Sequence, residues 1–182
     1  MTWDTFHRRG EVLRDVLAHV DAHRDGRLPM GLPGVAQTFG DEAALLGALQ
    51  LRWHTRLSGD IERELANSPA DPEAAVLTAW RSAARDLAGV RAVLDAAGEN
   101  PGGDEVAAMV AAARRKEWIL LAAMAGKASP SSPAATGVGR KLEERARAGY
   151  RPPSPPPRTR GRHASDRHRR SLRSRVKAAL AA

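Results

Sequence analysis

The sequence predicts an all-α protein: a four-helix bundle-like body, a flexible Pro/Ser-rich linker and a basic C-terminal tail. Apolar residues recur at spacings of three and four through residues 3–125, and the sustained period-two alternation of a strand is missing. Capping residues, glycines and prolines divide that span into four segments. From Ala128 onward the sequence is rich in Ser, Pro and Arg, and residues 128–139 have no apolar period.

The first two helices are expected at residues 3–25 and 41–66. In the first, one stripe would hold Trp3, Phe6, Gly10, Leu13, Leu17 and Val20. Residues 26–40 contain four glycines and two prolines, so we expect an apolar loop that packs over one edge of the body. The second helix starts at the capping residue Asp41 and, despite Ser58-Gly59, keeps a four-residue spacing.

The third and fourth helices are expected at residues 71–98 and 104–126. The third has the most regular stripe, whose members step by 4, 3, 4, 3 and 4: Val76, Trp80, Ala83, Leu87, Val90 and Leu94. This spacing predicts one continuous helix that faces another helix. Each of the four helices holds one tryptophan, and we expect these side chains to supply core volume rather than a binding surface: Trp3, Trp53, Trp80 and Trp118.

The body is therefore assigned to residues 1–127, the low-complexity linker to 128–165 and a basic amphipathic tail helix to 166–182. Within the linker, residues 140–148 favour a short helix that is marginal alone, because Leu142 is its single apolar anchor. Residues 151–158 favour polyproline II. The tail is expected to be disordered in isolation and to become helical on contact.

Charge is strongly segregated along the chain. Residues 1–127 hold 15 Lys and Arg against 18 Asp and Glu, whereas residues 128–182 hold 14 against 3. This asymmetry indicates an anionic partner, and arginine suits phosphate because its guanidinium donates two parallel hydrogen bonds. The predicted nucleic-acid-binding residues are Arg158, Arg160, Arg162, Arg167, Arg169, Arg170, Arg173, Arg175 and Lys177. The alternatives are a solubilising tail enriched by codon bias, an acidic protein partner and an anionic membrane surface.

Metal-binding and catalytic motifs are weak or missing. His19 and His23 share a helical face and, with His54, are weak candidates for a metal site in a bundle, but the Glu-x-x-His pairs of di-iron bundles are absent. The chain has no cysteine, which excludes a thiol nucleophile, a disulfide and a cysteine metal site. No catalytic or cofactor-binding residue is predicted, and no cofactor is expected.

These observations favour a cytoplasmic, non-enzymatic accessory or adaptor protein. Its tail would bind DNA, RNA or a ribonucleoprotein without sequence preference, while its body docks a protein partner or self-associates. The first alternative is an interaction module with a merely solubilising tail, in which the loop around Leu28–Phe39 binds another protein's helix. The second is a metal-binding helical-bundle enzyme. No secretory signal is evident, and the longest apolar run, Trp118–Ala125, is too short to span a bilayer.

Overall fold

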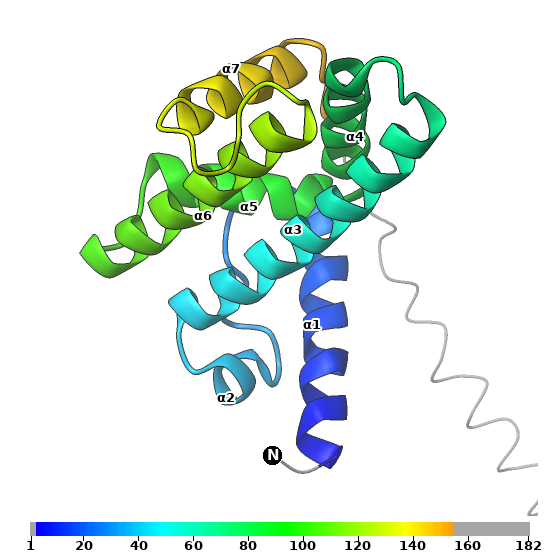
Figure 1. The fold of residues 1–182 in the computed structure, drawn as a ribbon. Helices are drawn as coiled ribbons and strands as arrows, with labels where there is room; N and C mark the ends of the chain where they lie inside the picture. The colour runs from blue at the N-terminus through cyan, green and yellow to red at the C-terminus, as the bar shows by residue number, and fades with distance from the viewer. Residues whose placement is uncertain (1–2, 155–182) are drawn as a thin grey trace, which may run out of the picture.

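The described part of the chain is built from helices alone (Figure 1). The computed structural model describes residues 3–154, with side chains from His7 onward. Within these residues there are seven helices and no strand, which confirms the all-α class. The helices are α1 (Trp3–His23), α2 (Val35–Phe39), α3 (Glu42–Asn67), α4 (Pro72–Asp86), α5 (Ala88–Glu99), α6 (Asp104–Met124) and α7 (Ala135–Ala148).

Helix α3 supplies the longest stripe of the core. Its residues Leu45, Leu49, Trp53, Leu57 and Ile61 are completely buried at spacings of four. Its start is capped as the sequence predicts, since the carboxylate of Asp41 accepts a hydrogen bond of 2.8 Å from the backbone N–H of Ala44. The helix continues through Gly59 without a break, which confirms the expectation of one long helix.

Helix α1 packs on the body through a face next to the expected one. Val12, Val16 and Val20 are buried, while Leu13 and Leu17 flank them and are only partly buried. Val20 of the expected stripe is buried as predicted, but Val12 and Val16, which the prediction left out, are more deeply buried than its members Leu13 and Leu17. The side chains of Trp3 and Phe6 lie outside the described residues.

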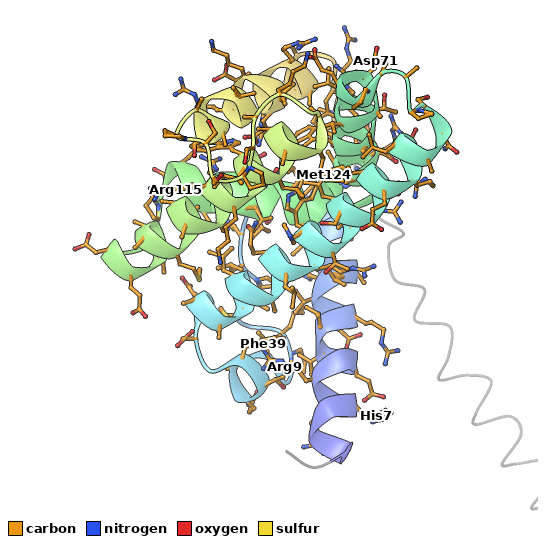
Figure 2. The ribbon with its side chains drawn as sticks, viewed as in Figure 1. His7, Arg9, Phe39, Asp71, Arg115 and Met124 are labelled. Carbon is orange, nitrogen blue, oxygen red and sulfur yellow. The ribbon has the colours of Figure 1, made fainter. Side chains whose placement is uncertain are left out.

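The glycine-rich segment after α1 packs over an edge of the body, as the sequence predicts, and includes the short helix α2. Val35 and Phe39 are buried. From α1, the Arg9 guanidinium lies 4.5 Å from the centre of the Phe39 ring and donates a hydrogen bond of 3.2 Å to the carbonyl of Thr38 (Figure 2). The apolar side chains of this segment thus mostly pack against the core.

The single helix expected over residues 71–98 is wrong, because the chain breaks at Leu87 into α4 and α5. The two helices cross steeply (Figure 1), and they pack on different neighbours: α4 on α3 and α7, α5 on α1 and α6. The break lies at Leu87, whose backbone leaves the helical region with φ of −120° and ψ of 41°. Gly89 then allows α5 to lie directly against α1, because an added Cβ atom would be 2.3 Å from the backbone of Val20.

The stretch from residue 128 was expected to be a flexible linker, but its described part contains a helix that packs on the body. Residues 135–148 form α7, which packs along α6 and against α4. Its contact stripe consists mainly of small residues: Ala135, Gly139, Leu142 and Ala146. At Gly139 an added Cβ would lie 1.8 Å from the carbonyl oxygen of Trp118. The sequence showed one apolar anchor, whereas the packing depends on small side chains that allow a close approach.

Candidate functional site

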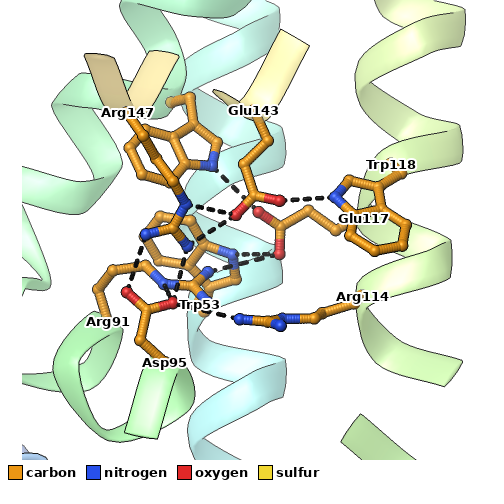
Figure 3. A network of polar contacts seen from close by, with 9 residues as sticks. Trp53, Arg91, Asp95, Arg114, Glu117, Trp118, Glu143 and Arg147 are labelled. Atoms are coloured by element: carbon orange, nitrogen blue, oxygen red, sulfur yellow. Dashed lines mark hydrogen bonds and ion pairs between the residues drawn. The ribbon is translucent and has the colours of Figure 1, made fainter. Parts of the chain in front are cut away.

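The most unusual feature of the core is a buried carboxylate that accepts hydrogen bonds from two tryptophans (Figure 3). Glu117 of α6 is 2% exposed. One of its oxygens accepts from Nε1 of Trp53 at 3.0 Å and the other from Nε1 of Trp80 at 3.1 Å. Arg91 of α5 compensates the charge: its Nη1 lies 3.6 Å from Glu117, and its guanidinium lies 4.8 Å from the Trp53 ring centre.

A second layer of charges joins α5 to α7 (Figure 3). Arg147 donates to Asp95 at 2.7 Å and to Glu143 at 2.7 Å, while Glu143 accepts from the indole N–H of Trp118 at 2.6 Å. Arg91 also donates to Asp95, at 2.7 Å. Burial raises the pKa of Asp95, but hydrogen bonds from Arg147 and Arg91 outweigh it, so the pKa of Asp95 lies below its usual value.

These two layers connect five helices, from α3 to α7, through charge-assisted hydrogen bonds. Among the buried side-chain nitrogen and oxygen atoms of residues 7–154, only Arg91 Nη1 and Arg114 Nε lack a hydrogen-bond partner. The network therefore matches buried charges and orients the helices. It fixes the position of α7, which leads the chain to residues 150–154.

The last described residues are held against the body. The Tyr150 hydroxyl donates to the carbonyl of Ala84 at 2.8 Å, and its ring packs edge to face on Trp80. Arg24, which has a left-handed backbone with φ of 50°, donates to the carbonyls of Pro153 at 2.5 Å and Ser154 at 3.1 Å. Residues 150–154 thus form an anchored segment at the end of α1.

A cavity of about 380 Å³ lies under the anchored segment, bordered by His23, Arg91 and Asp95. Burial raises the pKa of Tyr150, although the nearby Arg24 and Arg85 act in the opposite direction. The Tyr150 hydroxyl is therefore neutral at neutral pH and serves as a hydrogen-bond donor.

The predicted site residues are placed as follows. All nine nucleic-acid-binding candidates, from Arg158 to Lys177, lie outside the described residues. His19 and His23 stack at 4.0 Å at the end of α1, whereas His54 lines a groove between α3 and α6. Among the side chains that the structure describes, from His7 to Ser154, no group of three or more His, Cys, Asp or Glu residues is arranged to hold a metal ion.

Sequence reasoning missed the partners of the tryptophans. Glu117 lies within the apolar stripe of its helix, and a carboxylate at a core position was the signal that could have revealed it. Asp95 gave no such signal. Glu143, Arg147 and Tyr150 lie in the stretch assigned to the linker, so their burial was not expected.

Comparison with known proteins gives no relative: no family model, curated protein or solved structure matches the chain. Of the helices described in Figure 1, none combines the length and apolar character required to cross a bilayer.

Proposed function

We propose that the protein is a non-enzymatic accessory factor whose basic C-terminal arm, residues 158–177, binds DNA, RNA or a ribonucleoprotein while the helical body docks a protein partner. The distribution of charge carries this proposal. Residues 1–154 hold 20 Lys and Arg against 20 Asp and Glu, whereas residues 155–182 hold nine against one. The entire net charge of +8 therefore belongs to the last 28 residues.

The anchored segment, residues 150–154, supports the assignment of separate binding roles to the arm and the helical body. Only residues 155–157 separate Ser154 from Arg158 in the sequence, so the arm begins directly after the part of the chain that Arg24 and Tyr150 hold in place. Exposed Arg85 and Arg151 lie in the same region of the body. A nucleic acid bound by the arm would meet further positive charge there, with phosphate as the shared ligand.

The experiment is a salt titration of binding to duplex DNA and single-stranded RNA of unrelated sequences. If the arm neutralises about six phosphates of a duplex, the logarithm of the association constant should fall with the logarithm of salt concentration at a slope near −5. Changing Arg167, Arg169, Arg170 and Arg173 to Gln should reduce the slope by about one for each lost contact.

The matched control changes the same four arginines to Lys, which keeps the charge and should keep most of the salt slope. Binding that ignores salt, or that is unchanged when residues 158–182 are deleted, would contradict the proposal. Affinity purification with and without nuclease tests the alternative of an interaction module with a merely solubilising tail. A protein that binds the helical body directly remains bound after nuclease treatment, whereas a partner held through nucleic acid is lost.

A further inference from the structure

The N-terminal end of α6 projects outward from the body (Figure 1), and one face of its first three turns is exposed. The exposed residues of this stretch are acidic at its start, small in its middle and basic at its end: Asp104, Glu105, Ala108, Ala111, Ala112, Arg115 and Lys116. Glu105, Ala108, Ala112 and Arg115 are spaced by three, four and three, so they follow one line along the helix.

The charges on this face have no partner within the described residues. Neither Asp104 nor Glu105 forms an ion pair with another side chain of residues 7–154, and the same holds for Arg115 and Lys116. Figure 2 labels Arg115 on this helix. A second α6 lying antiparallel would bring Glu105 opposite Arg115 and Ala108 opposite Ala112, twice by symmetry. A parallel α6 would instead place like charges together.

An apolar groove runs beside this face. It has a volume of about 430 Å³ between α3 and α6, and its walls include Leu51, His54, Met109, Ala113 and Lys116. Leu51 is 67% exposed and, in the described part of the chain, is the single large hydrophobic side chain that is exposed. The groove therefore offers apolar surface to a helix that also carries opposite charges at its two ends.

We propose that α6 of a second copy of this chain occupies the groove, forming a two-fold symmetric dimer with the two α6 helices antiparallel. The alanines at the centre allow the helix axes to approach to about 8 Å. Leu51 is buried by the partner helix, and the acidic and basic ends pair across the symmetry axis. The dimer does not depend on the arm binding nucleic acid, so the two proposals succeed or fail separately.

Sedimentation of nuclease-treated, full-length protein over a range of concentrations tests the dimer. Glu105→Arg alone and Arg115→Glu alone each place two like-charge pairs across the axis, and each should weaken dimerisation at least tenfold. The two single variants mixed in equal amounts should form a heterodimer, because both contacts are then complementary. The double variant Glu105→Arg/Arg115→Glu should recover most of the wild-type affinity.

Two further variants complete the test. Leu51→Ala should also weaken the dimer. At concentrations where the protein is monomeric, the urea midpoint of this variant should equal that of the wild type, because Leu51 is exposed in the monomer. Glu62→Arg makes the same charge change as Glu105→Arg at an exposed position on α3 and should leave dimerisation unchanged. A wild-type chain that remains monomeric at about 0.5 mM overturns the proposal. Dimerisation that neither Glu105→Arg nor Arg115→Glu weakens also overturns it. The same holds if the groove binds a helix of a different protein and neither charge change affects that binding.

Discussion

At the scale of single residues, carboxylates accept hydrogen bonds from the indole N–H groups of all three tryptophans whose side chains are described. Trp53 and Trp80 share Glu117, and Trp118 uses Glu143. The sequence allowed the prediction that tryptophans build the core, and Trp53 and Trp80 are completely buried. It did not reveal their acceptors, because a hydrogen bond between residues 64 positions apart leaves no local pattern.

We expect Glu117→Gln to destabilise the fold by about 2–4 kcal/mol, since a carboxamide has one acceptor oxygen for two indole donors and removes one of the two carboxylates that pair with Arg91. The measurement is urea unfolding at pH 7 followed by tryptophan fluorescence. Glu144→Gln is the control, because its carboxylate is exposed and should cost less than about 1 kcal/mol. Equal midpoints for the two variants would contradict the role of Glu117.

The charge of Asp95 should stabilise the fold in a pH-dependent way. Its folded pKa lies below the unfolded value of about 3.9, so its contribution is present above about pH 4 and is lost as the pH falls through the folded pKa. Asp95→Asn should therefore cost about 2 kcal/mol at pH 7 and less at pH 3, measured by urea unfolding across this range. The exposed Asp15→Asn is the control. If the loss of stability caused by Asp95→Asn does not change with pH, the charge of Asp95 is not what stabilises the fold.

At the scale of helices, glycines decide how the elements meet. Gly89 allows α5 to touch α1, and Gly139 allows α7 to touch α6. The apolar spacing of residues 71–98 predicted the buried positions Val76, Trp80 and Leu94 correctly, but it did not reveal the break at Leu87. Periodicity reports which face is buried, whereas a change of direction depends on what each half packs against.

Two glycines of α7 provide a matched pair of variants. Gly139→Ala places a Cβ against the backbone of Trp118 and should destabilise the protein by about 1–3 kcal/mol or more. Gly137→Ala, in the same helix, meets nothing within 4 Å and should stabilise it by about 0.5–1 kcal/mol, because alanine favours the helix. Urea unfolding of both variants measures the difference, and the same sign for both would show that α7 does not pack on α6 in this way.

At the scale of the whole molecule, the described body extends to residue 154 rather than ending at residue 127. Removing residues after 127 would take away α7, Tyr150 and Arg147, which is one of the arginines that pair with Asp95. Composition suggested the earlier boundary because Ser, Pro and Ala dominate residues 128–139, and small residues look alike in a linker and in a tight helix contact.

A fragment of residues 1–154 should unfold cooperatively, with a urea midpoint close to that of the full chain. A fragment of residues 1–127 should lose this cooperative transition, since the Trp118 indole loses its acceptor Glu143, Asp95 loses Arg147, and the faces of α4 and α6 that pack on α7 are exposed. Circular dichroism during urea titration measures both fragments. A cooperative 1–127 fragment as stable as the longer one would contradict the place of α7 in the core.

The contact between Trp53 and Trp80 also gives the protein an optical signature. Their ring centres lie 5.9 Å apart with the planes at 74°, and both indoles are held by the same carboxylate. Two chromophores fixed at this separation in an asymmetric core should produce a strong near-ultraviolet circular dichroism band. That band should disappear whenever the core loosens while the helices persist, so it offers a label-free monitor of tertiary order in each variant discussed above.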